Sequence, residues 1–464
     1  MSGVVAIKTN DLITEKLLYS LSSIQHRGQD SAGLVFSDGT SLKRIKGSGL
    51  VNEVFKGADL YDKDYKLGIG HVRSSREGCQ QDYNIEPLVS FTKNNEFALA
   101  HDGNLANYDV IKQNLEDEGI SFHTQTDSEL ILLLISRYYK GDILEAIRKT
   151  MDVIKGAYSC VIAMPDKIIA FRDYQGFRPL MLGKDEENFI IASENEAIEI
   201  LDIKNYRNIN PGEIVVIEDN ELKSYPAENG INKKHCIFES IYIARPDANI
   251  ENVNSYMFRR RCGEILYRQA PVEADLVCPV PDSGTPSAIG FAQESGIPFA
   301  EGLVKNRYMG RSFIKPSQKE RELAVRLKLN PQKSVIDGKR IVLVDDSIVR
   351  GTTSAKLIKR MRDAGAKEVH FRVTSPPFMY PCFYGVDTPD SKNLIAANLS
   401  IEEIRQQIGA DSLEFINLDS MLKLVENPDN YCNACFTGNY PVKKDEIWIL
   451  QYLYQEAGAT LKHY

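Results

Sequence analysis

The sequence predicts two domains, an α+β layered domain followed by an α/β domain with a parallel sheet. Its length of 464 residues suits two or three domains of ordinary size. The first half contains short strands in pairs with few helices, whereas strand and helix alternate in the second half. The polar, turn-rich stretch PAENGINKK (residues 226–234) separates these patterns. We therefore expect domains at residues 1–232 and 233–464.

Short apolar runs predict the strands of the first domain. They are expected at residues 3–7, 32–36, 68–72, 96–100 and 158–164. The string Thr126-Asp127-Ser128 predicts the start of an amphipathic helix that reaches about residue 139, with Asp127 or a neighbour as N-cap. Paired strands with helices at their edges indicate an α+β arrangement.

The second domain is expected to contain strands at residues 274–280, 340–344 and 369–374. Helices are expected from about residue 285 and over residues 352–364, with Gly365 just past the end of the second helix. This alternation predicts a parallel sheet with crossover helices.

Charge and hydropathy exclude several classes of protein. The 64 acidic and 56 basic residues give a net charge of −8, so we expect no nucleic-acid partner. No secretory signal is evident at the start, and the longest clear apolar run, residues 130–135, is far too short for a membrane span. We expect no membrane partner and a cytoplasmic location, where clustered cysteines indicate metal binding or catalysis rather than disulfides.

The most specific string is RIVLVDDSIVRGTT at residues 340–353. An apolar strand ends in Asp345 and Asp346, where ligands of open α/β sheets bind. Adjacent carboxylates suit ribose hydroxyls or a Mg²⁺-bound substrate. Gly351, Thr352 and Thr353 then open a helix whose N-terminus can hold a phosphate. A polar strand-to-helix turn is the alternative. The complete string resembles the phosphoribosyl pyrophosphate (PRPP) signature of type I phosphoribosyltransferases.

Two further segments favour a polyanionic substrate. In CPVPDSGTPSAIG (residues 278–290), Asp282 and Ser283 follow another apolar strand and can turn donors toward a pyrophosphate. Residues 305–328 contain eight lysines and arginines against two glutamates, which indicates a basic lid over the substrate. The alternatives are an ordinary helix-capping turn and a solvated helix face.

Four strings in the first half carry a second resemblance. Together they resemble the class II glutamine amidotransferase domain of the N-terminal nucleophile hydrolases. The strings are HRGQDSAG (residues 26–33), GHVR (70–73), AHDGNL (100–105) and TDSE (126–129). In these enzymes the N-terminal residue attacks the amide, and its own α-amino group is the general base. We therefore interpret His26, His71 and His101 as structural residues.

Both halves in this order resemble the family of glutamine phosphoribosylpyrophosphate amidotransferases. KNRYMGRSFI (residues 305–314), VRLKLN (325–330) and ACFTGNYP (434–441) strengthen the resemblance. It implies a glycosyltransferase of purine biosynthesis in which glutamine-derived ammonia displaces pyrophosphate from PRPP, with Mg²⁺, to give 5-phosphoribosylamine. It also implies a homo-oligomer, a dimer or a tetramer, with purine nucleotides as inhibitors.

The resemblance assigns roles to individual residues. Arg73 would hold the glutamine carboxylate, Asp127 its α-amino group, and the Gly103 N–H would donate to the oxyanion. Ser283, Asp345 and Asp346 would form the Mg²⁺ site. The PRPP-binding residues would be Asp282, Ser283, Lys305, Arg307, Asp345, Asp346, Gly351, Thr352 and Thr353.

The glutaminase site departs from the family pattern. Ser2 stands where the family has its cysteine nucleophile, and Asp102 stands where it has the oxyanion asparagine. Ala6 replaces a glycine, and Ser74-Ser75-Arg76 replaces Tyr-Ser-Thr. We therefore expect a glutaminase that is much weakened or absent, with the PRPP chemistry retained. The alternatives are an ammonia-only phosphoribosyltransferase and a non-catalytic PRPP-binding regulator.

The sequence contexts of four cysteines match the iron–sulfur branch of the family. Cys236, Cys382, Cys432 and Cys435 would supply the four thiolates of a [4Fe–4S] cluster. Unmodified buried thiols and a Cys₄ zinc site are the alternatives. We assign no role to the remaining four cysteines, which are Cys79, Cys160, Cys262 and Cys278.

Overall fold

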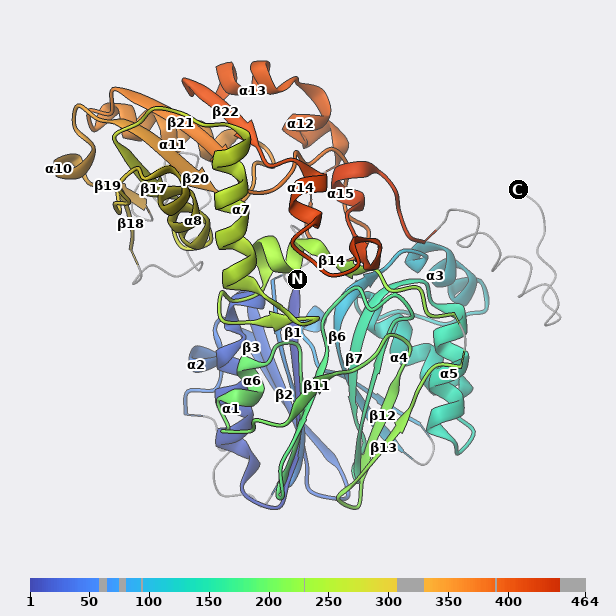
Figure 1. The fold of residues 1–464 in the computed structure, drawn as a ribbon. Helices are drawn as coiled ribbons and strands as arrows, with labels where there is room; N and C mark the ends of the chain where they lie inside the picture. The colour runs from blue at the N-terminus through green and yellow to red at the C-terminus, as the bar shows by residue number, and fades with distance from the viewer. Residues whose placement is uncertain are drawn as a thin grey trace. The chain divides into compact units, whose positions relative to one another are not determined.

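The protein is represented by a computed structural model, which describes residues 1–57, 65–74, 81–92, 95–228, 230–306, 329–388 and 390–442 (Figure 1). The chain divides into two compact units. Of the described residues, unit 1 contains those of Met1–His235 together with Phe383–Asp387 and 440–442, and unit 2 contains those of Cys236–Cys382 and Thr388–Asn439. The sequence predicted two continuous ranges, whereas short pieces from beyond residue 382 belong to unit 1.

Unit 1 is built on two antiparallel sheets. The first has the order β11-β9-β10-β1-β4-β2-β3 and the second the order β13-β12-β8-β7-β6-β5. The strands of the first are β1 (Ser2–Thr9), β2 (Ser31–Ser37), β3 (Leu42–Ser48), β4 (Leu67–Arg73), β9 (Met181–Lys184), β10 (Asn188–Ala192) and β11 (Tyr206–Asn208). Those of the second are β5 (Leu88–Phe91), β6 (Glu96–Leu105), β7 (Gly156–Ala163), β8 (Lys167–Arg172), β12 (Ile214–Glu218) and β13 (Glu221–Tyr225).

The two sheets face one another, and helices cover both outer faces (Figure 1). Alternate residues of β1, among them Val4 and Ala6, pack against Ala98 and Ala100 of β6 in the core between the sheets. The opposite side of β1 packs on α1 (Ile13–Ser23) and α6 (Glu196–Glu199). The second sheet packs on α3 (Tyr108–Asp117), α4 (Asp127–Tyr138) and α5 (Ile143–Val153). This layered α+β unit confirms the predicted class, with Thr126 as the N-cap of α4.

Unit 2 has a four-stranded parallel sheet in the order β17-β20-β21-β22. Its strands are β17 (Leu276–Pro279), β20 (Arg340–Asp345), β21 (Glu368–Val373) and β22 (Ser412–Phe415). Among the described residues, the helices of eight or more residues are α7 (Ser255–Gln269), α8 (Thr285–Ser295), α11 (Thr352–Asp363) and α13 (Ile401–Ile408). The parallel sheet with crossover helices confirms the predicted α/β class.

Short elements complete unit 2. The pair β18 (Leu303–Lys305) and β19 (Leu329–Pro331) is antiparallel, and β14 (His235–Cys236) pairs with β23 (Tyr431–Cys432). The short helix α15 (Ala434–Thr437) follows β23. Within the described ranges, no helix is both long and apolar enough to cross a membrane.

Candidate functional site

Ser2, the first residue of β1, lies at the centre of the first candidate site. It pairs with Arg73 across β1 and β4 and is buried. The Ser2 backbone N–H donates to Asp102 Oδ1 at 3.0 Å, and the Ser2 carbonyl accepts from Arg27 Nε at 2.9 Å. Two side chains that are distant in sequence therefore fix the start of the chain.

Asp102, on β6, accepts hydrogen bonds on both carboxylate oxygens. Its Oδ2 accepts from Arg27 Nη2 at 2.9 Å and from Arg178 Nε at 3.4 Å. Burial favours the protonated form, but the charges of Arg178 and Arg27 together outweigh burial and hold the pKa of Asp102 well below its usual value. The carboxylate is therefore ionised and can only accept hydrogen bonds.

A second buried carboxylate, Glu194, shares Arg27 with Asp102. Arg27 Nη1 donates to Glu194 Oε1 at 2.6 Å, and His26 Nε2 lies 2.9 Å from the same oxygen. Burial raises the pKa of Glu194, but His26 and Arg27 outweigh burial and lower it to about 2. Sequence reasoning missed Arg178 and Glu194, because neither lies in one of the four strings that resemble the amidotransferase domain. Only the fold brings them to this network.

Glu86 is another residue without a signal in the sequence, and it holds both remaining histidines of the site. It accepts from the His101 backbone N–H at 2.9 Å and from the Ser128 hydroxyl at 2.7 Å. His71 Nε2 lies 3.7 Å from Glu86 and 3.1 Å from the His101 carbonyl. Burial lowers the pKa of His71. These contacts support a structural role for His71 and His101.

Arg73 and Asp127 keep part of their side chains open, at 16% and 18% exposure, as ligand-binding groups require. Arg73 Nη1 donates to the Asn84 carbonyl at 2.9 Å, and Asp127 Oδ2 accepts from the Leu105 N–H at 2.9 Å. Asp127 is the first residue of α4, so the start of that helix fixes its carboxylate beside the end of β6.

Gly103 follows Asp102 on β6. Its φ is +152°, and a Cβ at this position would lie 2.0 Å from the Ala157 carbonyl oxygen on β7. The close approach of the two strands therefore requires glycine. The next residue, Asn104, donates to the Phe383 carbonyl at 2.9 Å, and Tyr384 stacks on Phe177 with ring centroids 4.2 Å apart. The segment Phe383–Asp387, which the sequence assigned to the second domain, thus packs beside this site.

In unit 2, the two predicted loops meet at the carboxyl ends of β17 and β20. The Ser283 hydroxyl, just before α8, donates to Asp346 Oδ2. The Ser347 hydroxyl donates to Asp346 Oδ1 at 2.5 Å, and the Asp346 N–H donates to Asp345 Oδ1 at 2.9 Å. The sequence therefore correctly predicted that Ser283, Asp345 and Asp346 lie together.

Both carboxyl groups of this acid pair are buried and hold their protons more tightly than usual. Burial raises the pKa of Asp345, and the charge of Asp346 raises it further. Burial also raises the pKa of Asp346. The hydrogen bonds from Ser283 and Ser347 and the nearby Arg259 charge lower it, but their effect is smaller. Two buried carboxylates with few cationic neighbours form a site that favours an incoming cation.

Gly351, Thr352 and Thr353 lie at the N-terminus of α11, which follows the acid pair. Gly351 is the N-cap residue with a φ of +75°, and a Cβ there would lie 2.5 Å from Ile395 Cδ1. Thr352 and Thr353 are exposed in the first turn. Free backbone N–H groups at the start of a 12-residue helix offer donors to a phosphate.

Asp282, in the loop after β17, forms an ion pair with Lys305 of β18. Together with Thr285, Asn306 and Asn330 they line a hollow of about 820 Å³. The peptide bond between Pro281 and Asp282 is cis. Arg307 and the rest of the basic stretch, residues 307–328, lie outside the described residues.

The four cysteines of the predicted cluster come together in unit 2. β14 carries Cys236 beside Cys432 of β23, and Cys435 lies on α15. Burial raises the pKa of Cys435, and Cys382, Cys236 and Cys432 raise it further, so these three thiols lie within electrostatic reach of Cys435. Phe378 packs edge-on against Phe238 and Phe436, at centroid distances of 5.0 and 5.1 Å. These three rings connect the chain segments that carry the four cysteines.

In the described ranges, no group of three or more His, Cys, Asp or Glu side chains is arranged around a single metal ion. Mg²⁺ is commonly bound by one or two carboxylates plus substrate phosphates, and each iron of a [4Fe–4S] cluster takes only one thiolate. Cys160, Cys262 and Cys278 are buried separately, and Cys79 lies outside the described residues.

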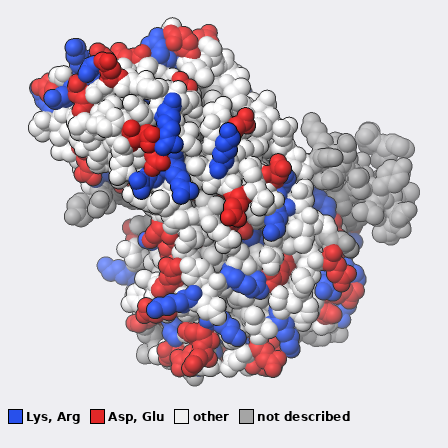
Figure 2. All heavy atoms as spheres, in the orientation of Figure 1, with Lys and Arg blue, Asp and Glu red and all other residues white. Residues whose placement is uncertain are grey.

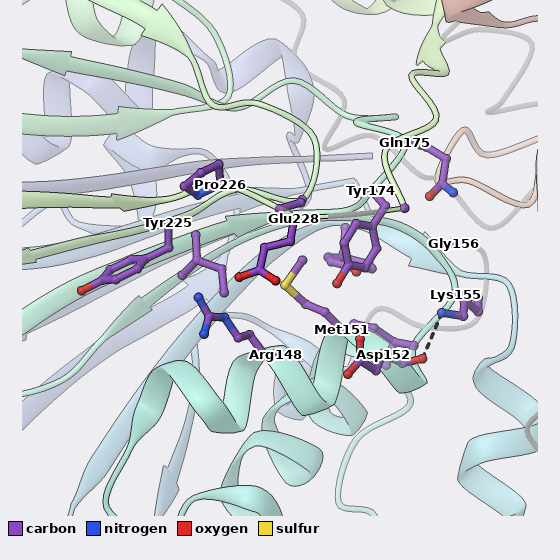
Figure 3. Close-up of a pocket in the computed structure, with 16 residues that line it drawn as sticks. Arg148, Met151, Asp152, Lys155, Gly156, Tyr174, Gln175, Tyr225, Pro226 and Glu228 are labelled. Carbon is purple, nitrogen blue, oxygen red and sulfur yellow. Dashed lines mark hydrogen bonds between the residues drawn. The ribbon is translucent and has the colours of Figure 1, made fainter. Parts of the chain in front are cut away.

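A separate hollow of about 680 Å³ lies in unit 1, lined by Arg148, Asp152, Tyr174, Tyr225 and Glu228 among others (Figure 3). It contains none of the residues that the sequence predicted for either site. On the face drawn in Figure 2, acidic and basic side chains are interspersed over both units.

Comparisons with known proteins match both halves of the chain. A glutamine amidotransferase domain matches residues 71–200, and a phosphoribosyl transferase domain matches residues 252–375. The amidophosphoribosyltransferase of Methanocaldococcus jannaschii is 45% identical, over 96% of this chain and 98% of that protein. The Bacillus subtilis enzyme is 42% identical, over 99% of this chain and 97% of its own length.

Solved structures show the same likeness. A structure described as the allosteric regulatory enzyme of purine biosynthesis aligns with a TM-score of 0.90 at 42% identity, covering 96% of this chain and 97% of that one. The glutamine PRPP amidotransferase from B. subtilis, complexed with ADP and GMP, aligns with a TM-score of 0.89 at 42% identity, over 96% of this chain and 98% of that one. The chain therefore belongs to the amidophosphoribosyltransferases, the glycosyltransferases of purine biosynthesis.

Proposed function

We propose that this amidophosphoribosyltransferase forms 5-phosphoribosylamine mainly from PRPP and ammonia, because its glutaminase site is weakened. The observation that carries the proposal is the position of Asp102, which accepts from Ser2, Arg27 and Arg178, because the charges of the two arginines favour an ionised carboxylate that can only accept. In the family the position of Asp102 is an asparagine whose side chain can donate to the oxyanion. A carboxylate at this position offers no donor and repels the developing negative charge.

The expected cost is large. Removal of one oxyanion donor lowers the rate by about 10²–10³-fold in a well-studied hydrolase. Ser2 adds to this loss, since a serine hydroxyl is a weaker nucleophile than a cysteine thiol near neutral pH. Arg73 and Asp127 remain partly open to bind glutamine, so we assign the loss to the chemical step and not to substrate binding.

For the PRPP step we propose that the sugar phosphate binds along the carboxyl ends of β17 and β20. The N–H groups of Thr352 and Thr353 would bind the 5-phosphate, and Gly351 allows the close approach of the backbone. Asp345 and Asp346 would face the ribose, with Ser283, Asp282 and Lys305 near the pyrophosphate. Arg307 remains a prediction from the sequence.

Asp345, Asp346 and Ser283 are the residues that would hold Mg²⁺. A divalent ion there would neutralise charge on the departing pyrophosphate. The buried, weakly compensated acid pair supports this assignment, because such a pair favours a cation.

We further propose that Cys236, Cys382, Cys432 and Cys435 hold a [4Fe–4S] cluster. The proposal is supported by Cys435, whose thiol lies within electrostatic reach of Cys236, Cys382 and Cys432. A cluster would tie β14, β23 and α15 into one structural unit. We also expect this enzyme to work in the cytoplasm, whose reducing conditions keep cysteines available as metal ligands.

Regulation and assembly follow the family in our proposal. A relative binds ADP and GMP, and we expect purine nucleotides to inhibit this enzyme too. We also expect a homo-oligomer, a dimer or a tetramer. Three large apolar side chains are exposed: Leu12 is the N-cap of α1, Tyr19 lies within α1, and Ile200 follows the end of α6. These side chains are available for a subunit contact.

The donor assay tests the proposal. PRPP and Mg²⁺ are supplied with either glutamine or ammonia, and pyrophosphate release is measured. We expect ammonia to support turnover at a rate at least about 100-fold above that with glutamine, from the missing oxyanion donor. Comparable rates with the two donors would contradict a weakened glutaminase. No release with either donor would instead indicate a non-catalytic PRPP-binding regulator.

A further inference from the structure

The backbone nitrogen of Ser2 lies 3.0 Å from Asp102 Oδ1. When Met1 is removed, this nitrogen becomes the α-amino group, which is the general base in N-terminal nucleophile hydrolases. A general base must be unprotonated before it can take a proton from the attacking hydroxyl. Asp102 is therefore in direct contact with the atom that would accept the proton.

We propose that Asp102 holds the α-ammonium group of a Ser2 N-terminus in an ion pair, so that the amine stays protonated near neutral pH and cannot activate the hydroxyl. The inference rests on the proposed weak glutaminase and supplies a second cause for it. Asp102 is a positioning residue in this respect, because it acts through the amine of Ser2.

Charged groups face this nitrogen from several elements. Arg73 of β4 is the cross-strand partner of Ser2, and Arg27 donates to the Ser2 carbonyl. Arg178, from the loop after β8, binds the far oxygen of Asp102, and Asp387 also acts on the chain start. Behind them Glu194 binds Arg27 and is itself contacted by His26.

The arginines have two opposite effects on the proposed ion pair between Asp102 and the Ser2 amine. Their charges keep Asp102 ionised at every pH where an amine titrates. They also disfavour a nearby ammonium. The amine of Met1 illustrates this balance: burial lowers its pKa to about 6, Asp102 raises it, and Arg178 and Arg73 lower it. The nitrogen of Ser2 differs because it is in direct hydrogen-bond contact with the carboxylate.

The size of the effect can be bounded. An opposite charge in contact shifts a pKa by about 1–3 units toward the charged form. At a pH below the pKa of an amine, the fraction of unprotonated amine falls about tenfold for each unit by which the pKa rises. Removal of the Asp102 charge should therefore increase the reactive fraction at pH 7 by about 10–1000-fold.

The α-amine can be titrated directly, without any glutaminase activity. Chains beginning at Ser2 and at Met1, each verified by mass spectrometry, are pulsed with acetic anhydride over a pH series, and acetylation of the N-terminal peptide is measured. We expect the labelling midpoint of the Ser2 chain to lie at least about one unit above that of the Met1 chain. Equal midpoints, or a lower midpoint for the Ser2 chain, would overturn the proposal.

The variant Asp102→Asn in the Ser2 chain should lower the labelling midpoint by about one unit or more. Glu194→Gln is the matched control, since it removes a charge from the same buried network without contacting Ser2, and its midpoint should stay near that of the unaltered chain. A midpoint that Asp102→Asn does not move would refute the proposed ion pair, even if glutamine remains a poor donor. If Asp102→Asn does not fold, the comparison of the two unaltered chains decides the question.

Failure of the proposed function has a different signature. If glutamine and ammonia drive the unaltered enzyme equally, the weakened glutaminase is wrong, whatever the labelling shows. If ammonia is the far better donor and the labelling midpoint of Ser2 is not raised, only the proposed ion pair is wrong.

Discussion

The guanidinium of Arg27 donates to the carboxylate of Glu194 at 2.6 Å, with both side chains fully buried. The same guanidinium donates to Asp102 at 2.9 Å. Asp102 lies on β6 of the second sheet, and Glu194 follows β10 of the first, so one buried cation links the two sheets of unit 1. The network that shapes the glutaminase site therefore also contributes to the stability of the fold.

Replacement of Arg27 by Met should destabilise unit 1 by about 3–5 kcal/mol, because two buried carboxylates would lose their shared cation. Urea unfolding followed by circular dichroism measures this change. Arg44→Met is the control, since Arg44 is exposed on β3 and its loss should change the free energy of unfolding by less than about 0.5 kcal/mol. Equal effects of the two substitutions would argue against the buried network.

Acid should release part of this stabilisation. The folded protein lowers the pKa of Glu194 from 4.5 to about 2, so its contribution is complete above pH 4.5 and is lost as the pH falls toward 2. The difference in free energy of unfolding between the unaltered chain and Glu194→Gln should therefore shrink over that interval. Urea unfolding at several pH values tests this, and a difference that stays constant would contradict the depressed pKa.

The phosphate-binding region was largely predictable because its information is local. In residues 340–353, a continuous apolar run predicts the buried strand, the two acids mark its end, and glycine with two threonines predicts the start of α11. One stretch of chain contains the strand, the loop and the helix, so few long-range contacts are needed to place their side chains.

The glutaminase site was less predictable because its contacts are long-range. Ser2 and Asp102 are 100 residues apart, and the sequence presents them as two independent departures from a family pattern. Only the pairing of β1 with β4 and the packing of the two sheets make them one contact. Arg178, Glu194 and Phe383–Asp387 carry no local signal for the same reason.

Gly351→Ala should weaken both the fold and PRPP binding. The left-handed φ of +75° costs about 1 kcal/mol for alanine, and the added Cβ would lie 2.5 Å from Ile395. Gly338→Ala separates these effects, because Gly338 has a φ of +71° but no atom within 4 Å of a built Cβ. We expect both variants to lose stability and only Gly351→Ala to raise the KM for PRPP. Unchanged PRPP kinetics in Gly351→Ala would contradict a phosphate site at the start of α11.

Asp346→Asn should lower the rate of pyrophosphate release by roughly 100-fold or more with either nitrogen donor. The acid pair would lose a charge that is needed to hold Mg²⁺ and orient PRPP. Its fold should persist, since the Asn amide oxygen can accept from one of the hydroxyls of Ser283 and Ser347 while its NH₂ group donates to the other. Asp363→Asn, at the exposed end of α11, is the control and should leave turnover unchanged. Loss of turnover with glutamine alone would place the defect in unit 1 and contradict this role.

Cys236→Ala should remove the brown colour of anaerobically purified protein and lower its iron and acid-labile sulfide, because a [4Fe–4S] cluster needs all four thiolates. The pairing of β14 with β23 should weaken as well, since the cluster would join the segments that carry Cys236, Cys432 and Cys435. Cys262→Ala is the matched control: Cys262 is buried on α7, away from this group, and its loss should leave iron and sulfide unchanged. A colourless unaltered protein that contains one zinc and no sulfide would instead establish the Cys₄ zinc site.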